Sequence, residues 1–244
     1  MKHRLILITG ANGSTGAHLA GHYLNQGASL ILLYHNRTDR LEALLQKPGV
    51  FALACDLRDL AKLREVYQRA CAYFGRIPDS LIHTASVRSA DAQYLEETNP
   101  EVWSDVFSTN LYSFTNILRV ILPGMKERAF GRVVLMGSDV TGKGLARGTA
   151  YAASKAAMVN LVRSLMLENA GENLRFNAIS PGPIETKLED DYKGEYLEFR
   201  RDYFARYLRD NPAKSLCSLS EITELCDLLL SENTNNLNGQ EIIL

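Results

Sequence analysis

Short apolar runs recur along the chain and are separated by longer stretches that mix apolar and polar residues. The runs lie at Leu5–Thr9, Leu30–Tyr34, Val50–Cys55, Leu81–Thr84, Val133–Met136, Leu174–Ile179 and Ile242–Leu244. Short strands that are apolar on both faces and alternate with helices are typical of a parallel sheet covered on both sides. The pattern predicts an α/β fold: one doubly wound domain over residues 1–244, with a seven-stranded parallel sheet and helices on both faces.

Glycines stand where the amphipathic stretches end. Gly27 follows the stretch behind the first strand, Gly75 follows Asp59–Phe74, and Gly171 follows Ala150–Ala170. A glycine just past the last helical residue commonly adopts the left-handed backbone that closes a helix. No linker or repeat interrupts the series, so we expect a single domain.

Residues 187–215 depart from this alternation. The segment opens with the charged run Lys187–Asp191. Aromatic residues then follow at steps of four, three, four and four, namely Tyr192, Tyr196, Phe199, Tyr203 and Tyr207. These steps predict one aromatic stripe on a helix, which either packs against the domain or lines a pocket for an apolar or ring-bearing substrate. We expect the segment to be a lid over the active site.

Composition excludes several classes of partner. The 244 residues carry a formal net charge of −1 and an isoelectric point near 6.5. There is no basic footprint for nucleic acid or an anionic membrane, and we expect neither partner. The cysteines are scattered, with no histidine at metal-ligand spacing, which predicts no metal site and no disulfide framework. The apolar run behind Met1–Arg4 stops after four residues, so it indicates a strand rather than a signal peptide, and we expect a cytoplasmic protein.

A glycine-rich loop joins the first strand to the helix that follows it. Glycines at such a turn let the backbone approach a pyrophosphate, and the helix N-terminus supplies amide donors and the positive end of a dipole. The alternative is a structural turn without a ligand. We expect a Rossmann-type nucleotide site with contacts from Gly10, Asn12, Gly13, Ser14, Thr15 and Gly16.

The end of the second strand bears on the choice of nucleotide. An NAD site usually has an acidic residue about 20 residues after the glycine loop, to bind the ribose 2′-hydroxyl. This chain has no acid between Gly16 and Asp39 and instead offers His35, Asn36 and Arg37. These donors suit a 2′-phosphate, so we predict NADP(H). The alternative is that the three residues form a solvated loop.

Asp56 and Leu57 follow the third strand, where a side chain could reach the adenine. Asp56 could equally cap the helix that begins near Asp59. The residues alone do not separate these two interpretations.

Tyr151 and Lys155 stand four residues apart, and Ser138 follows the apolar run Val133–Met136. A four-residue step puts the phenol and the ammonium on one face of a helix, where the cation can lower the phenol's pKa. At about 4 Å and an effective dielectric near 20, that attraction is about 4 kcal/mol, or roughly three pKa units. The pair is suited to moving a proton.

These residues together resemble the short-chain dehydrogenase/reductase family over essentially the whole chain. The branch with 3-oxoacyl-[acyl-carrier-protein] reductases and carbonyl reductases is the most similar. The matching positions are Asn110, Ser138, Tyr151, Lys155 and the run Asn177–Thr186. The resemblance implies that Tyr151 protonates the carbonyl oxygen, Ser138 holds that oxygen, and Lys155 binds the nicotinamide ribose.

The resemblance assigns two further roles. Asn110 would anchor a water that relays protons to Lys155, the alternative being a helix-interior amide that bonds to local backbone. The segment behind the sixth strand would seat the nicotinamide carboxamide, the alternative being a plain turn. Its contact residues would be Pro181, Gly182, Ile184 and Thr186.

The chain departs from the family pattern at three places. Ser14 replaces a usual glycine, and His83-Thr84-Ala85-Ser86 replaces Asn-Asn-Ala-Gly, although we still expect Thr84, Ala85 and Ser86 to contact the cofactor. Relatives typically continue briefly beyond the segment Gly239–Leu244, so we expect either a missing tail or a different subunit contact.

The predicted activity is NADPH-dependent reduction of a ketone, a 3-oxoacyl thioester or another carbonyl compound, by a homodimer or homotetramer formed through the long central helices. The substrate would be a small molecule, free or bound to a carrier protein that could meet Lys143, Arg147 and Arg128. The alternatives are an NAD(P)-dependent alcohol or sugar dehydrogenase and a non-catalytic nucleotide-binding sensor or scaffold.

Overall fold

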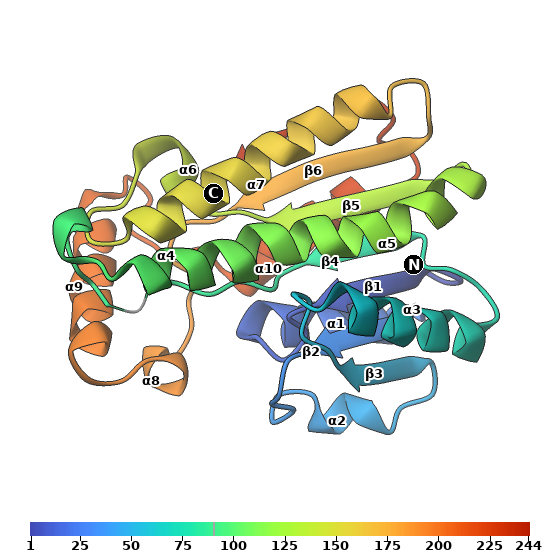
Figure 1. Cartoon of the computed structure of the whole chain (residues 1–244), viewed down its shortest axis with the longest axis horizontal. Helices are drawn as coiled ribbons and strands as arrows, with labels where there is room; N and C mark the ends of the chain where they lie inside the picture. Colours follow the sequence, from blue (N-terminus) through green and yellow to red (C-terminus); the bar gives the residue numbers. More distant parts are fainter. Residues whose placement is uncertain (90) are drawn as a thin grey trace.

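The computed structural model describes residues 1–89 and 91–244 and contains one seven-stranded sheet. The strand order is β3-β2-β1-β4-β5-β6-β7, and every neighbouring pair is parallel. The strands are β1 (Leu5–Thr9), β2 (Ser29–Tyr34), β3 (Val50–Ala54), β4 (Ser80–His83), β5 (Gly131–Met136), β6 (Leu174–Ser180) and β7 (Glu241–Ile243). The predicted doubly wound parallel sheet is confirmed (Figure 1).

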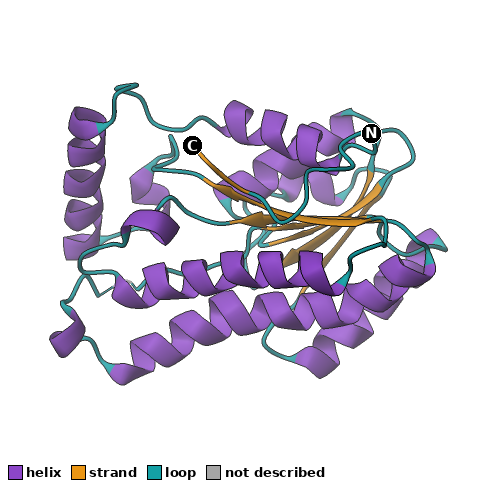
Figure 2. Cartoon of the chain, turned by 90° about the horizontal axis from the view of Figure 1, so that it is seen from above, coloured by secondary structure: helices purple, strands orange, loops and turns teal. Residues whose placement is uncertain are grey.

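Helices cover both faces of the sheet (Figure 2). The α-helices are α1 (Ser14–Asn25), α2 (Glu42–Leu45), α3 (Leu60–Phe74), α4 (Pro100–Phe107), α5 (Ser113–Glu127), α6 (Val140–Lys143), α7 (Thr149–Glu168), α8 (Leu188–Asp191), α9 (Gly194–Asp210) and α10 (Leu219–Leu230). A short 3-10 helix spans Leu95–Glu97 and a π-helical turn, η2, spans Ser108–Tyr112. None of the helices in the described ranges combines the length and apolar character needed to cross a bilayer.

The alternation of side chains along β1 divides the core into two layers. Leu5 and Leu7 pack in one cluster with residues of α3, α5 and α7. Ile6 and Ile8 point to the opposite face and pack with residues of α1 and α10. A strand that buries side chains on both faces explains why its sequence is a continuous apolar run.

The strand order creates the crevice for a ligand. Between β1 and β4 the direction of winding reverses, so the connections behind these two strands run to opposite faces of the sheet. In open α/β sheets a ligand binds in the crevice at the carboxyl ends of the strands at such a point. The glycine loop follows β1 and the His83–Ser86 segment follows β4, so both lie at this crevice.

The observed helix ends agree only in part with those predicted from the glycine positions. Gly75 closes α3 in a left-handed conformation with φ of 63°. The helix α7 ends at Glu168 with Asn169 as its cap, so Gly171 lies beyond the helix end. The side chain of Asp59 accepts a hydrogen bond from the Lys62 amide and caps α3, so the interpretation of Asp56 as that cap is wrong.

Residues 187–215 form α8 and α9, and α9 stands beyond the end of the sheet (Figure 1). Backbone hydrogen bonds close the base of the segment, from the Cys217 amide to the Pro183 carbonyl and from the Glu185 amide to the Cys217 carbonyl, both 2.9 Å. Tyr192 lies between the two helices, so the expectation of one stripe on one helix is wrong for this residue. A separate helix, α9, begins after it at Gly194, with Lys193 as the N-cap.

Candidate active site

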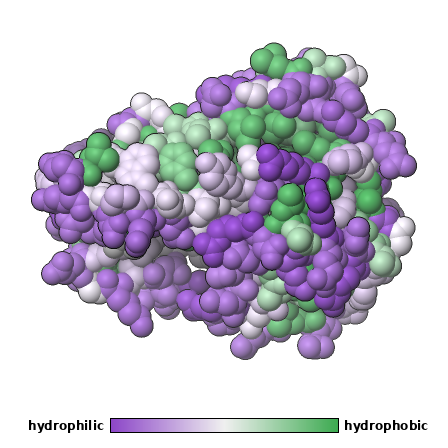
Figure 3. Space-filling view, in the orientation of Figure 1, coloured by the Kyte–Doolittle hydropathy of each residue, from purple (hydrophilic) through white to green (hydrophobic). Residues whose placement is uncertain are grey.

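Two adjoining cavities occupy the crevice at the carboxyl ends of the strands. The larger, of about 590 Å³, extends from the glycine loop to the ends of β4, β5 and β6 and to the 187–215 segment. The smaller, of about 340 Å³, lies over the ends of β2 and β3, and Ser86, Val87 and Asp105 line both. In the space-filling view this face of the molecule is hollowed between the 187–215 segment and the part that contains β1 to β3 (Figure 3).

The glycine loop is packed tightly against the segment behind β4. Gly10 has a φ of +65°, and a Cβ there would lie 2.6 Å from the Ala85 amide nitrogen. A Cβ on Gly16 would lie 2.5 Å from the Gly10 carbonyl oxygen. The Thr84 hydroxyl donates to the Thr9 carbonyl at 2.7 Å and fixes the two segments together. Only glycine fits these two positions.

The N-terminus of α1 is suited to an anion. Its cap residue, Gly13, has no side chain to occupy the first amides, and the first turn contains no acid. Ser14, Thr15 and Gly16 line the larger cavity beside these amides. An uncapped helix N-terminus at a ligand cavity fits the pyrophosphate of a dinucleotide.

Asn12 and Arg37 meet at Asp39 rather than in either cavity. The Asn12 amide nitrogen donates to Asp39 at 3.0 Å, and the Arg37 guanidinium donates to both Asp39 oxygens at 3.1 and 3.0 Å. The Asn12 hydrogen bond first, and then Arg37, hold the pKa of the Asp39 carboxyl below its usual range. Asn36 is exposed and lines neither cavity in the described part of the chain.

The smaller cavity has a charged wall that the sequence pattern indicated only in part. His35, Asp56 and Leu57 line it as expected, and His35 lies 3.9 Å from Asp56. Arg58 was not predicted. Its guanidinium donates to Asp56 at 2.8 Å and to Asp105 at 3.2 Å, and this joins the end of β3 to α4.

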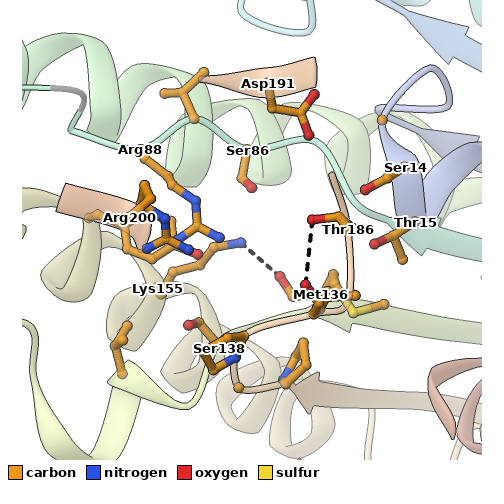
Figure 4. Close-up of a pocket in the computed structure, with 18 of the residues that line it drawn as sticks. Ser14, Thr15, Ser86, Arg88, Met136, Ser138, Lys155, Thr186, Asp191 and Arg200 are labelled. Carbon is orange, nitrogen blue, oxygen red and sulfur yellow. Dashed lines mark hydrogen bonds between the residues drawn. The ribbon is translucent and has the colours of Figure 1, made fainter. Parts of the chain in front are cut away.

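Tyr151 and Lys155 lie on one face of α7 in the larger cavity and are 4% and 1% exposed. The Lys155 ammonium is 5.8 Å from the centroid of the Tyr151 ring and donates to the Met136 carbonyl at 2.8 Å. Ser138, behind β5, lines the same cavity (Figure 4). The structure thus brings together three of the four predicted catalytic residues.

Arg88 is the cation with the largest effect on Tyr151. Its guanidinium carbon lies 4.9 Å from the centroid of the Tyr151 ring. Burial alone would raise the pKa of Tyr151, but Arg88, then Lys155, then the Ser138 hydroxyl bring the pKa below its ordinary value. Lys155 lowers the pKa of Tyr151 as expected, and Arg88, which was not predicted, lowers it more. The sequence could have indicated this role only through the position of Arg88, a basic residue shortly after β4.

Asn110 lies completely buried in the π-helical turn and lines neither cavity in the described ranges. Its side-chain oxygen accepts from the Val87 amide at 2.7 Å. Its nitrogen donates to the Val87 carbonyl at 3.0 Å and to the Ser154 hydroxyl at 2.9 Å. The side chain joins the loop behind β4 to α7, so the interpretation as an amide that serves its own helix is wrong.

His83 replaces a family asparagine and is completely buried under the site. Its Nδ1 lies 2.8 Å from the Thr9 hydroxyl, and its ring packs against Phe114 with centroids 4.7 Å apart. Burial first, and then the Lys155 charge, lower the pKa of His83 to about 3. The ring is therefore neutral and acts as a support between β1 and β4.

The segment behind β6 lines the larger cavity at all four predicted positions, Pro181, Gly182, Ile184 and Thr186. A Cβ on Gly182 would lie 2.5 Å from the Tyr207 hydroxyl oxygen, so α9 packs directly on this turn. The turn is thus both a cavity wall and a seat for the 187–215 segment, and the geometry leaves both interpretations of it open.

The three cations considered for a carrier protein have partners within the chain. Lys143 pairs with Asp139, and Arg128 donates to the Ile77 carbonyl at 3.3 Å. Arg147 donates to the Ala92 carbonyl and lies 5.2 Å from the Phe199 ring centroid. Among the described residues no cluster of three or more His, Cys, Asp or Glu could hold a metal ion.

The chain is similar to known oxidoreductases along nearly its full length. The family model described as Enoyl-(Acyl carrier protein) reductase matches residues 10–244. Oxidoreductase UcpA of Salmonella typhimurium is 32% identical, with 98% of this chain and 91% of that protein covered. Acetoacetyl-CoA reductase of Rhizobium meliloti is 30% identical, with 98% and 95% covered.

A solved structure, that of levodione reductase, matches with a TM-score of 0.89 and 25% identity and covers all of this chain and 96% of its own. Together with the crevice, the glycine loop and the Ser138, Tyr151 and Lys155 geometry, these matches define the class. The chain belongs to the short-chain dehydrogenase/reductase family. It is an oxidoreductase with a Rossmann-type fold for a nicotinamide cofactor.

Proposed function

We propose that the protein is an NADPH-dependent ketone reductase that converts a carbonyl compound to a secondary alcohol. The observation that supports this most strongly is the buried Tyr151 with two cations, Arg88 and Lys155, against its ring and Ser138 in the same cavity. A phenol whose pKa is lowered toward the working pH is an effective proton donor. The reduction catalysed by the acetoacetyl-CoA reductase relative is of the same type.

The residues of this chain would divide the reaction as follows. A bound reduced nicotinamide supplies the hydride that adds to the carbonyl carbon. The Tyr151 hydroxyl gives its proton to the carbonyl oxygen, and the Ser138 hydroxyl donates a hydrogen bond that holds this oxygen. Lys155 would leave the Met136 carbonyl to bind the nicotinamide ribose, and a water anchored by Asn110 would relay protons to Lys155.

The cofactor would lie across both cavities. The amides of Gly13–Gly16 would hold the pyrophosphate, Asp56 and Leu57 would flank the adenine, and Thr84–Ser86 would line the path between them. Pro181, Gly182, Ile184 and Thr186 would seat the carboxamide. The 187–215 segment would be the lid over the substrate.

The preference for NADPH would rest on His35, Asn36 and Arg37. Arg37 pairs with Asp39 in this structure. A bound 2′-phosphate would therefore have to replace the Asp39 carboxylate as the partner of the Arg37 guanidinium. Arg37 is 60% exposed, and the rotation that this exchange requires is open to it.

A titration of intrinsic fluorescence with NADPH and with NADH tests the cofactor. Clearly tighter NADPH binding supports the proposal, whereas tighter NADH binding favours a dehydrogenase that works in the oxidative direction. A screen of ketones with the wild type and Tyr151→Phe tests the chemistry. Unchanged turnover in Tyr151→Phe would show that Tyr151 is not the proton donor.

The assembly would be a homodimer or homotetramer through the long central helices. Tyr112, at the start of α5, and Leu167, near the end of α7, are 58% and 70% exposed. Large apolar side chains on such helices are suited to a subunit contact. Sedimentation equilibrium would give the mass, and a monomer at micromolar concentration would contradict this assembly.

A further inference from the structure

Two arginines from distant parts of the chain meet in the larger cavity beside Tyr151. Arg88 comes from the loop behind β4 and Arg200 from the middle of α9 (Figure 4). The Arg88 Nε donates to the Tyr192 hydroxyl at 2.8 Å, and the Arg200 guanidinium carbon lies 5.6 Å from the Tyr192 ring centroid. Tyr192 therefore contacts both guanidinium groups, and the 187–215 segment holds them in place.

Neither arginine pairs with a carboxylate in the described ranges, although the same cavity contains three acids. Each of those acids has a basic partner of its own. The pairs are Asp105 with Arg58, Asp139 with Lys143 and Asp191 with Arg40. The cavity therefore holds two guanidinium groups without a carboxylate partner, in addition to the Lys155 ammonium that bonds to the Met136 carbonyl.

Arg200 is the more deeply placed of the two. The residue is 2% exposed, and its Nε has no hydrogen-bond partner among the described residues. Aromatic rings surround the guanidinium, with centroids of Phe204 and Tyr203 at 5.0 and 5.1 Å. Ring faces attract a cation only weakly, and a buried guanidinium gains most from a carboxylate that accepts two hydrogen bonds.

An anion bound at the two arginines would be separate from the cofactor pyrophosphate. Ser14 and Thr15, at the α1 N-terminus, lie on the opposite side of the cavity from Arg88 and Arg200 (Figure 4). A group at the two arginines is instead next to Tyr151, where the reacting carbonyl is placed. A negative charge at this position would belong to the substrate.

We propose that the substrate is an oxo acid whose carboxylate is bound by Arg88 and Arg200 while its ketone lies at Tyr151 and Ser138. This inference rests on the proposed reductase function and specifies the substrate class of the same site. The planar fork of a guanidinium matches a carboxylate in shape as well as in charge. The short separation of Arg88 and Tyr151 places the carboxylate only a few carbons from the ketone.

The test compares oxo acids with their neutral methyl esters. Steady-state rates are measured with reduced nicotinamide for 3-oxobutanoate, 4-oxopentanoate, 5-oxohexanoate and the methyl ester of each. We expect kcat/KM for the best acid to exceed that of its ester by about 100-fold or more, because the ester leaves both guanidinium groups, one of them buried, without an anionic partner. Equal values for every acid and its ester would overturn the inference and leave the reductase proposal intact.

Variants connect the preference to the two side chains. Arg88→Gln and Arg200→Gln should each lower the ratio of kcat/KM for the acid to kcat/KM for its ester by about tenfold or more, a ratio in which any effect of the arginine on Tyr151 itself cancels. Arg201→Gln is the matched control, since Arg201 neighbours Arg200 on α9 but pairs with Glu189 and Glu198 outside the cavity. Preserved acid preference in both cavity variants would overturn the assignment. If Arg200→Gln fails to fold, Arg88→Gln alone tests the assignment, because Arg88 lies in a loop and its replacement should disturb the fold less.

A binding experiment separates this inference from the reductase proposal. Calorimetry of Tyr151→Phe with bound nicotinamide measures affinity for 4-oxopentanoate and its methyl ester without turnover. Selective binding of the acid that Arg88→Gln abolishes would support the oxo-acid site even if no ketone were reduced. Binding of neither, or of both alike, would overturn it.

Discussion

Arg40, behind β2, forms an ion pair of 3.1 Å with Asp191 at the end of α8. The two residues are 151 positions apart, and they join the loop beside the nucleotide site to the proposed lid. Asp190 lies 3.7 Å from the same guanidinium. If the proposed function holds, this contact would couple the nucleotide loop to the proposed lid.

Removal of this contact should loosen the lid. A partly exposed pair contributes about 1 kcal/mol or less, so Asp191→Asn should raise KM for the ketone by up to about fivefold with little effect on folding. Glu189→Gln, on the same helix but paired with Arg201, is the control. The wild-type KM should also rise with salt, whereas that of Asp191→Asn should depend less on salt. An unchanged KM in Asp191→Asn would contradict a role in closure.

The pH profile of reduction should report the cations beside Tyr151. Tyr151 must be protonated to act as the acid, so reduction should decline as pH rises through its pKa, which lies below the ordinary value of 10. Arg88→Gln removes the main lowering influence, so the declining limb should move to higher pH. Measurement of kcat/KM against pH for an ester substrate, with Arg201→Gln as control, checks this. A limb that stays in place would show that Arg88 does not act on Tyr151.

Two glycines of the same helix should respond in opposite ways to alanine. In Gly16→Ala the new Cβ would lie 2.5 Å from the Gly10 carbonyl, so the loop must distort and nucleotide affinity should decrease by about tenfold or more. A Cβ on Gly21 meets nothing within 4 Å, so Gly21→Ala should stabilise the fold by about 0.5–1 kcal/mol and leave affinity unchanged. Fluorescence titration and urea unfolding measure the two effects. Normal nucleotide affinity in Gly16→Ala would contradict a close approach of the backbone to the ligand.

His83 should make the fold sensitive to acid. Its pKa is about 3 in the folded chain against an ordinary value of 6.5, so below pH 6.5 the unfolded chain takes up a proton that the folded chain excludes. The contribution of neutral His83 to stability should therefore diminish as pH falls from 6.5 toward 3, by a few kcal/mol in total. Urea unfolding at several pH values should show a smaller decrease for His83→Asn than for the wild type, with exposed His35→Asn as control. Equal decreases would place the acid sensitivity elsewhere.

The pair of Arg37 and Asp39 should tune the choice of nucleotide. Asp39→Asn frees the guanidinium and removes a charge that repels phosphate, so NADPH affinity should increase by about tenfold or less. Arg37→Gln should weaken NADPH and leave NADH nearly unchanged. Titrations of both variants with both nucleotides test the interpretation. Equal changes for NADPH and NADH would show that neither side chain is near a 2′-phosphate.

The sequence identified the parts of the site that lie close together along the chain. Tyr151 and Lys155 share a helix face through a four-residue step, and the glycine loop follows β1 directly. It identified Asp56 as a site residue but could not say which of its neighbours would bond to it. Arg58 and Asp105 complete that wall, but no spacing in the sequence relates them, because Arg58 lies in the turn before α3 and Asp105 lies on α4.

By itself the sequence determined the parallel sheet, the position of the nucleotide loop and the Tyr151–Lys155 pair, because strand burial, turn chemistry and helical spacing are set by neighbours in the chain. Only the tertiary structure decided that Arg88 and Arg200 share a cavity, since Tyr192, which contacts both, is 104 positions from Arg88. It also decided that Asn110 holds the Val87 loop to α7. Such contacts depend on how separate elements pack around one crevice, and that packing has no periodic signature in the sequence.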